Sequence, residues 1–460
     1  MRETFLPFAP PMIGEEEIAE VVDTLRSGWL TTGPKTRQFA EQFSAYTQAP
    51  AALTLNSCTA ALHLSLVALG ICEGDEVITT PLTFAASVNV IEHVGARPVL
   101  VDVEPDTLNI DPERIEQAIT SATKAIIAVH YAGHPVELDA IRDIADRYNL
   151  HLIEDAAHAI GASYKGQRIG SGSNPTCFSF YATKNLTTGE GGMLTGDEEL
   201  VDKARTLSLH GMSREAWSRY AAGGKWAYDI VAPGFKCNMT DLQAALGIQQ
   251  LRRFESMQAR RREIIGQYQQ AFGGLEAFQT PVHRDHVTHA WHLYVLRLNE
   301  SELTIDRNKF IEEVNARNIG TSVHFIPIHI HSFYAKKYDW KPEDLPVALA
   351  NYNRMLSLPL SPKMTDADVS DVINAVHDVP LPLKGNECWL IKVWLAERRA
   401  TKSNHIKCSP ECCSGKMPAT LNNAAEVSDS HGLRLWPVFP DILRMIVTAF
   451  RCRRIFDGAK

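Results

Sequence analysis

The chain has 460 residues, of which 45% are hydrophobic and 22% charged, the ordinary composition of a soluble globular protein with about two or three domain-sized units. Its formal net charge of -8 gives no electrostatic support to nucleic-acid binding by the chain as a whole. The 9 Cys lack dense regular spacing, and neither a signal peptide nor an apolar stretch of ~18 residues is found, so we expect a cytoplasmic protein without a membrane span.

The first 250 residues alternate helical stretches with short apolar runs. Apolar residues at helical spacing predict helices over 15–27, 60–69, 112–119 and 139–148. Short apolar runs predict strands over 76–79, 98–103, 125–130 and 150–154. This alternation predicts a large α/β domain over residues 1–250 with a mainly parallel sheet, which binds ligands at the carboxyl ends of its strands.

A long helix over 241–270 is expected to lead into a smaller C-terminal α+β domain over residues 251–380. Within it we expect a strand over 290–298 and helices over 306–317 and 365–377.

Residues 381–460 differ from the rest of the chain. They contain 13 Lys and Arg against 7 Asp and Glu, and five of the 9 Cys. They show no sustained helical or strand period, and we expect a poorly ordered or non-native segment, as read-through of a shifted frame would produce. The adjacent pair Cys412 and Cys413 lacks the regular spacing of a zinc site, so no metal is expected.

The first motif with a chemical reading is the stretch Asn56-Ser57-Cys58-Thr59, which opens an apolar helix. The free N–H groups and the dipole at a helix start favour an anion such as phosphate, and Thr59 would add a hydroxyl. The alternative is an ordinary Ser/Thr helix cap without a ligand.

The second motif is an apolar strand that ends in Glu154 and Asp155 and is followed by His158. A carboxylate at a strand end can pair with a protonated ring nitrogen, or it can simply cap the next turn.

The third motif is a strand that delivers Ser179 and then Lys184 into a Gly-rich turn. A neutral lysine amine is the nucleophile of Schiff-base chemistry, although a lone lysine after a strand is usually solvated.

Together these segments resemble the DegT/DnrJ/EryC1/StrS aminotransferase family over about residues 7–379. The resemblance implies a pyridoxal-5′-phosphate (PLP) enzyme of transferase fold type I. Within the family the chain is most similar to enzymes that aminate C4 of a UDP-linked 4-keto sugar, such as the 4-amino-4-deoxy-L-arabinose enzyme. Further segments that carry the resemblance are residues 27–34, 74–77, 83–84, 95–98, 129–133 and 234–245.

The resemblance implies catalytic roles for three residues. Lys184 forms the Schiff base with PLP and moves a proton between the amino donor and the cofactor. Asp155 pairs with the pyridine nitrogen, and His158 lies close to the ring and the substrate. Phe84 is expected on one face of the ring, and the phosphate-binding positions are Cys58, Thr59, Ser179 and Asn238.

Asn238 matches a residue that reaches the phosphate from a partner subunit, so a homodimer with a shared active site is implied. The substrate-side candidates are His324, Trp29 and Tyr131, with a buried structural role as the alternative for each. The implied substrates are a nucleotide-linked keto sugar and L-glutamate, in polysaccharide, lipopolysaccharide or amino-sugar biosynthesis.

Lys184 also bears on the reaction type. Some members of the family have His at this position and act as dehydratases, so Lys favours transamination. A dehydratase, a cyclitol aminotransferase and a non-catalytic amino-sugar sensor on the same fold remain as alternatives.

Overall fold

The structure is a computed structural model that describes residues 2–213 and 228–379. The expectations for residues 381–460, including the Cys and basic content of that segment, lie outside the described residues. Among the described helices, none combines the length and the apolar character that crossing a bilayer requires.

The central sheet has seven strands in the order β1-β9-β8-β5-β4-β2-β3. Strand β9 pairs antiparallel with both of its neighbours, whereas every other pair is parallel, which confirms the prediction of a mainly parallel α/β sheet. The carboxyl ends of the parallel strands and the beginning of β9 therefore share one edge. The strands are β1 (Ala51–Leu55), β2 (Glu76–Thr79), β3 (Arg97–Leu100), β4 (Thr123–Val129), β5 (His151–Asp155), β8 (Thr176–Ser179) and β9 (Gly192–Gly196).

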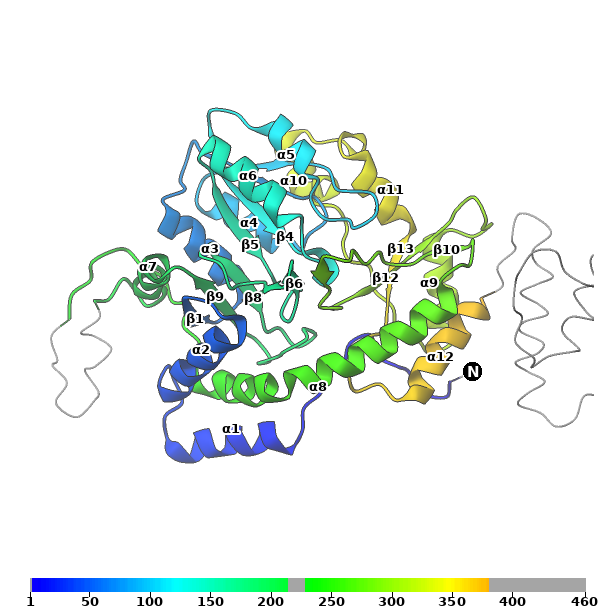
Figure 1. The fold of residues 1–460 in the computed structure, drawn as a ribbon, viewed down its shortest axis with the longest axis horizontal. Helices are drawn as coiled ribbons and strands as arrows, with labels where there is room; N and C mark the ends of the chain where they lie inside the picture. Colours follow the sequence, from blue (N-terminus) through cyan, green and yellow to red (C-terminus); the bar gives the residue numbers. More distant parts are fainter. Residues whose placement is uncertain (1, 214–227, 380–460) are drawn as a thin grey trace, which may run out of the picture. The chain divides into compact units, whose positions relative to one another are not determined.

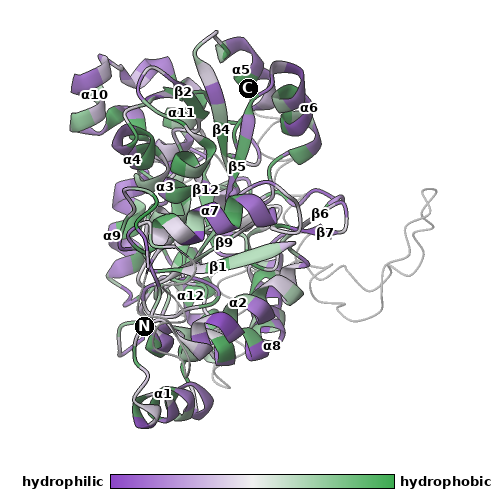
Figure 2. Cartoon of the chain, turned by 90° about the vertical axis from the view of Figure 1, so that its left-hand side faces the viewer, coloured by the Kyte–Doolittle hydropathy of each residue, from purple (hydrophilic) through white to green (hydrophobic). Residues whose placement is uncertain are grey.

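Helices pack around this sheet according to the distribution of their apolar residues. Helix α3 is apolar on nearly every side and is mostly buried, whereas α6 buries a single face that includes Ile141 and Ile144. Figure 2 shows this difference, with α3 mainly hydrophobic and α6 mixed. The helices around the sheet are α2 (Pro34–Thr47), α3 (Cys58–Leu69), α4 (Ala86–His93), α5 (Pro112–Ala118), α6 (Leu138–Tyr148) and α7 (Glu198–Ser208). Helix α1 (Glu15–Ser27) precedes them in the chain and makes its main contacts away from this sheet.

Helix α8 (Asp241–Phe272) connects the central sheet to a second group of elements. A capping box formed by Thr240 and Gln243 begins the helix, which packs on α1 and α2 at one end and on α12 (Asp366–His377) at the other (Figure 1). The predicted division between residues 250 and 251 falls inside this helix. Tyr268 and Phe272 of α8 belong to the core beneath the second sheet.

The second sheet is antiparallel, with the order β10-β12-β13. A short third sheet pairs β11 with β6 and β6 with β7. The elements not yet bounded are β6 (Ser163–Tyr164), β7 (Gln167–Arg168), β10 (Phe278–Gln279), β11 (Val287–Thr288), β12 (Tyr294–Leu298), β13 (Met355–Leu358), α9 (Arg307–Asn315), α10 (Ser332–Tyr338), α11 (Pro346–Arg354), and the 3-10 turns η1 (Tyr131–Gly133), η3 (Ile328–Ile330) and η4 (Pro342–Asp344).

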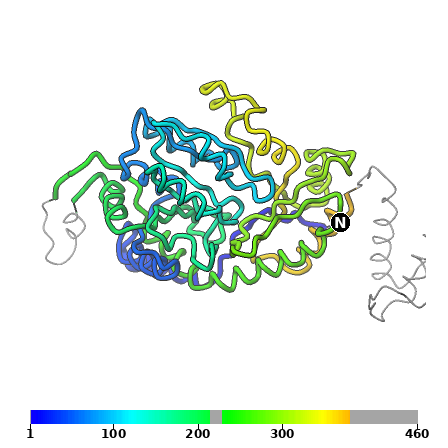
Figure 3. Tube along the Cα trace, turned by 45° about the horizontal axis from the view of Figure 1, so that its top comes forward, coloured from blue at the N-terminus to red at the C-terminus, as the bar shows by residue number. Residues whose placement is uncertain are grey.

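The N-terminal segment lies against the second group of elements and not against the central sheet (Figure 3). Leu6 forms a parallel bridge with Ile319, and Arg2 forms ion pairs with Asp368 and Asp371 of α12. The beginning and the end of the described chain are therefore held together.

One predicted strand starts later than expected. The strand predicted over 290–298 begins only at Tyr294, because the preceding residues bond to the turn η1 instead of to a strand. The N–H of Ala290 donates to Gly133 O at 2.8 Å, and the N–H of His292 donates to Ala132 O at 3.1 Å. Trp291 between them has a φ of 49°, which no strand residue adopts.

Candidate active site

The three predicted motifs meet at the shared edge of the central sheet. Strand β5 ends at Asp155, β8 ends at Ser179, and β1 ends just before the start of α3 at Cys58. The Lys184 amine lies within electrostatic range of Cys58 and Asp155, and its charge also acts on His158 and His324. The fold thus brings together residues that lie far apart in the sequence.

The Asp155 carboxylate is buried and accepts hydrogen bonds on both oxygens. Ser87 Oγ of α4 donates to Oδ2 at 2.7 Å, and the N–H of Ala157 donates to Oδ1 at 3.1 Å. The Cys58 thiol lies 3.9 Å from Oδ1. Sequence reasoning missed Ser87, because no helix was predicted over residues 86–93; its hydroxyl also lies 2.7 Å from that of Thr83.

Lys184 lies in a loop that backbone bonds hold against the end of β8. The N–H of Lys184 donates to Tyr181 O at 2.9 Å, and the N–H of Thr188 donates to Phe180 O at 2.9 Å. Burial lowers the pKa of the Lys184 amine to about 8, although Cys58 and Asp155 act in the opposite direction. A substantial share of the amine is therefore neutral near physiological pH, as a nucleophile requires.

The start of α3 forms a cradle for an anion. Ser57 is the N-cap, and its Oγ accepts the N–H of Ala60 at 3.1 Å, so the helix-cap interpretation is right for this residue. The N–H groups of Cys58 and Thr59 face outward from the helix start and have no partner within the helix. A Cβ on Gly192 would lie 2.4 Å from the Ser57 carbonyl carbon and 2.5 Å from the Cys58 nitrogen, so only glycine lets β9 begin this close.

Two predicted phosphate residues flank this cradle differently. Ser179 pairs with Gly192 across β8 and β9, which places it beside the start of α3. The Cys58 side chain points inward, since its sulfur also lies 3.4 Å from Cys177 O, and burial raises the pKa of the thiol well above its usual value. Cys58 can therefore contribute its backbone N–H to the cradle, and not a thiolate.

His158 and His324 are neutral imidazoles beside Lys184. Burial and the positive charge of Lys184 lower the pKa of His158 far below its usual value and that of His324 to about 4. The His158 ring stacks 5.7 Å from Phe325, and its Nδ1 has no hydrogen-bond partner among the described residues. His324 Nδ1 lies 2.9 Å from Ser357 Oγ.

Two further predicted residues, Phe84 and Tyr131, differ in their exposure to solvent. Phe84 is 66% exposed, and its ring centroid lies 6.1 Å from that of Phe325, so most of its side chain is accessible to a ligand. Tyr131 is only 2% exposed, and its hydroxyl donates to the His324 carbonyl, which favours the core alternative for this residue.

Trp29 and Asn238 both contact Thr32. The indole N–H of Trp29 donates to Thr32 O at 3.0 Å, and Asn238 Nδ2 donates to Thr32 Oγ1 at 2.6 Å. Asn238 also forms a backbone bridge with Leu55, directly before the first motif, and its amide oxygen accepts from Lys236. Asn238 thus lies next to the cradle, and Trp29 is linked to it only through Thr32.

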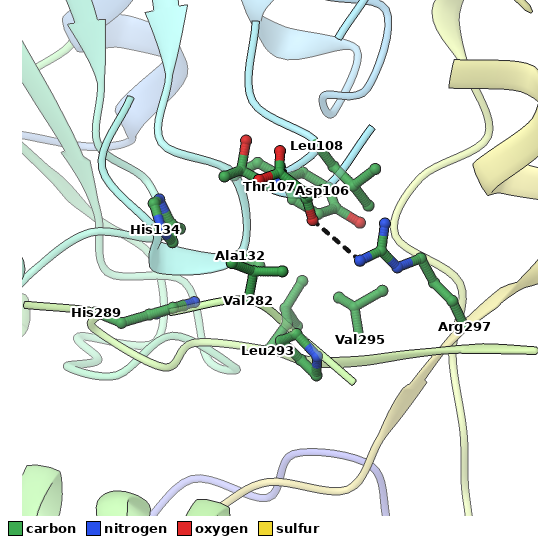
Figure 4. Close-up of a pocket in the computed structure, with 12 residues that line it drawn as sticks. Asp106, Thr107, Leu108, Ala132, His134, Val282, His289, Leu293, Val295 and Arg297 are labelled. Atoms are coloured by element: carbon green, nitrogen blue, oxygen red, sulfur yellow. Dashed lines mark hydrogen bonds between the residues drawn. The ribbon is translucent and has the colours of Figure 1, made fainter. Parts of the chain in front are cut away.

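A separate pocket of about 340 Å³, which includes open solvent, lies between η1 and the segment before β12 (Figure 4). Tyr131 is the one predicted site residue among those that line it. His134 faces this pocket, and its Nε2 has no partner among the described residues, which suits an ordered water molecule. The pocket does not include Lys184 or Asp155.

Comparison with known proteins identifies the family of this chain. Residues 11–377 match the sequence profile of the DegT/DnrJ/EryC1/StrS aminotransferase family. The chain belongs to this family. The aminotransferase is 54% identical over 380 residues to the spore coat polysaccharide biosynthesis protein SpsC of Bacillus subtilis, a match that covers 82% of the chain and 98% of SpsC. It is 58% identical, with the same coverage, to an uncharacterised protein of Methanocaldococcus jannaschii.

Solved structures agree with this assignment. A protein from Streptococcus pneumoniae described as a sugar aminotransferase, solved in its PMP form, superposes with a TM-score of 0.75 at 40% identity, covering 81% of this chain and 98% of that one. The same protein has been solved in its PLP form, with the same TM-score. The predicted family, the fold type and a PLP-dependent aminotransferase activity are therefore confirmed.

The residues at the sheet edge fit the three polar parts of PLP. The amine of Lys184, with its lowered pKa, suits the aldehyde, and the carboxylate of Asp155 suits a protonated ring nitrogen. The start of α3 suits the phosphate, since Gly192 leaves it uncovered. The unpaired Nδ1 of the buried His158 supplies a further polar group at the same place.

Proposed function

We propose that this aminotransferase moves an amino group from L-glutamate to the keto carbon of a nucleotide-linked keto sugar, with a UDP-4-keto sugar as the first candidate. The observation that carries the proposal is the Lys184 amine, with its lowered pKa, beside the buried Asp155 carboxylate. The similarity to SpsC supports polysaccharide biosynthesis as the setting, and amino-sugar or lipopolysaccharide biosynthesis uses the same reaction type.

Each residue of the site has one task in this proposal. PLP, when bound, supplies the electron sink that lets a bond at the amino carbon break. Lys184 holds the cofactor through its amine and then takes and returns the proton at the donor's carbon. Asp155 pairs with the ring nitrogen, and the start of α3 with Thr59 and Ser179 binds the phosphate.

The exposed side of the site receives the substrates. Phe84 would cover one face of the bound cofactor, Trp29 and His324 would stand on the substrate side, and His158 would lie close to both the ring and the substrate. His324 is neutral near physiological pH because burial lowers its pKa to about 4. It can therefore orient a sugar hydroxyl through hydrogen bonds without repelling the charged amine of Lys184. Binding energy from the distant nucleotide would hold the keto carbon in place.

We further propose that the enzyme works as a homodimer in which Asn238 completes the phosphate site of the partner subunit. The support is the family resemblance, in which the position of Asn238 reaches the phosphate from a partner subunit; within its own subunit Asn238 bridges Leu55 beside the cradle.

Substitution of Lys184 by Ala tests the proposal. Borohydride reduction of the parent enzyme with PLP should add the cofactor to Lys184, as shown by mass spectrometry of peptides, and Lys184→Ala should lose both this adduct and turnover. Lys165→Ala, which removes an exposed lysine paired with Asp139, is the control and should retain both.

A screen of UDP- and dTDP-linked 4-keto sugars, with glutamate as donor, then identifies the substrate. Formation of 2-oxoglutarate together with an amino sugar supports the proposal, and loss of water from the sugar without amino transfer contradicts it.

A further inference from the structure

Asn185, the residue after Lys184, is buried and fully hydrogen-bonded. Its Nδ2 donates to Ala290 O at 2.8 Å and to Gln258 Oε1 of α8 at 3.3 Å. Its Oδ1 lies 3.1 Å from Nδ1 of His292. Asn185 therefore joins the Lys184 loop to α8 and to the segment before β12.

These bonds determine the tautomer of His292. Both hydrogens of the Asn185 amide point to acceptors, so its Oδ1 must accept from His292 Nδ1. His292 then carries its hydrogen on Nδ1 and has a free lone pair on Nε2. Its pKa lies far below the usual value because of burial first and then because of the surrounding groups His158, Lys184, Arg261 and His324, so the ring stays neutral.

The His292 ring also supports His158. The two ring centroids lie 4.4 Å apart, with an angle of 36° between the planes. The backbone of His292 is fixed as well, since its N–H donates to Ala132 O at 3.1 Å. A Cβ on Gly133 would lie 2.8 Å from His158 O and 3.2 Å from His292 N, so the turn between the two histidines is tightly packed.

We propose that His292 is a positioning residue of this aminotransferase. Its Nδ1–H, held by Asn185, keeps the Lys184 loop in place, and its ring holds His158 at the same site. The inference rests on the proposed role of Lys184, and it adds a residue from outside the three sequence motifs. Without the hydrogen bond, the buried Asn185 oxygen loses its partner, the loop moves, and the partly exposed Lys184 becomes more accessible to water.

A matched pair of variants tests the proposal. In His292→Asn the amide nitrogen can take the place of Nδ1 and still donate to Asn185, whereas His292→Phe keeps a ring and loses the donor. The full-length chain, freed of PLP, is labelled with trace acetic anhydride over a range of pH, and the labelling of Lys184 is measured by mass spectrometry relative to the exposed Lys165. Thermal unfolding of each variant reports on folding separately.

The parent should show half-maximal labelling of Lys184 near the pKa of about 8. His292→Asn should stay within about 0.3 pH units of the parent, and His292→Phe should rise by about one pH unit or more, because water then solvates the charged amine. Should His292→Phe fail to fold, His292→Gln replaces it, since Gln places its amide at the far end of the ring and leaves the Nδ1 position without a donor.

Two results would overturn the proposal: an unchanged labelling curve in a folded His292→Phe or His292→Gln, or a rise in His292→Asn as large as in those variants. A merely structural role would lower the unfolding temperature without separating Asn from Phe in the labelling curve. Failure of the proposed function looks different, because borohydride would then mark a residue other than Lys184 in the parent enzyme with PLP.

Discussion

At the scale of single residues, the Asp155 carboxylate depends on donors from two other elements. Ser87 comes from α4, and Cys58 comes from the first turn of α3. These contacts hold the carboxylate in one orientation, so that a cofactor ring nitrogen meets an acceptor already in place.

Replacement of Ser87 by Ala should therefore weaken cofactor binding without unfolding the protein. A hydrogen bond to a charged group contributes about 1.5–3 kcal/mol, which corresponds to a roughly 10- to 100-fold rise in the Kd for PLP. Absorbance titration of the PLP-free protein measures this change. The control is Ser65→Ala, which removes another buried hydroxyl, bonded to Ala61 O, and should leave the Kd nearly unchanged. Equal effects of both substitutions would contradict the role given to Ser87.

The sequence was sufficient to single out Asp155 and Lys184 as candidates, and the fold brings both to one edge of the central sheet. It was insufficient for Ser87, Asn185 and His292, because each acts through a contact that sequence spacing does not encode. Asn185 and His292 are 107 positions apart and meet only because the segment before β12 folds against η1.

At the scale of elements, the site depends on how closely β9 approaches the start of α3. The Gly-rich turn could be predicted to let backbone come close to a ligand, but the structure shows that Gly192 lets one backbone come close to another. Likewise, the sequence pattern predicted a strand that ends at Leu298 but did not show that it begins only at Tyr294. Local periodicity contains no information on hydrogen bonds to a distant turn.

The approach of β9 to α3 predicts opposite effects for two glycine substitutions. Gly192→Ala places a Cβ within 2.6 Å of Ser57 and Cys58 backbone atoms and should lower the free energy of unfolding by about 1–3 kcal/mol, with loss of PLP binding. In Gly266→Ala in α8 the new Cβ meets no atom within 4 Å, so this substitution should raise the free energy of unfolding by roughly 0.5–1 kcal/mol. Urea unfolding measures both, and a stable Gly192→Ala that binds PLP normally would refute the packing argument.

At the scale of the whole molecule, buried neutral histidines make stability depend on pH. Burial lowers the pKa of His134 and of His324 to about 4, and it lowers those of His158, His289 and His292 far below the ordinary 6.5. The unfolded chain binds protons as the pH falls through 6.5, whereas the folded chain does not, so protonation favours unfolding.

We therefore expect the PLP-free protein to lose stability progressively between about pH 6.5 and pH 4, by about 1–3 kcal/mol for each of His134 and His324, and the other three imidazoles act in the same direction. His324, which is less completely buried than His134, should lie at the lower end of this range. Urea unfolding at pH 7.5 and pH 5 measures the loss. An unfolding free energy that is the same at both pH values would show that the folded and unfolded chains take up equal numbers of protons, so that folding does not lower the pKa of these imidazoles.

The proposed shared site gives a prediction for mixed subunits. Lys184→Ala and Asn238→Ala should each be nearly inactive as pure proteins. Unfolded and refolded together in equal amounts, they should regain about one quarter of the parent activity, because half of the dimers are mixed and each of these contains one complete site. Separately refolded and then combined samples, kept at low temperature, are the control. No recovery in the refolded mixture would show that Asn238 serves its own subunit.

The N-terminal segment has a consequence for how the protein is made. Leu6 pairs with Ile319, and Arg2 pairs with Asp368, which is 366 positions further along the chain. A ribosome adds about 5–20 residues per second, so these first residues wait on the order of tens of seconds for their partners to be synthesised. The central sheet can assemble during that interval, and Leu6, which is buried in the folded protein, stays available to chaperones until the segment around Ile319 has been synthesised.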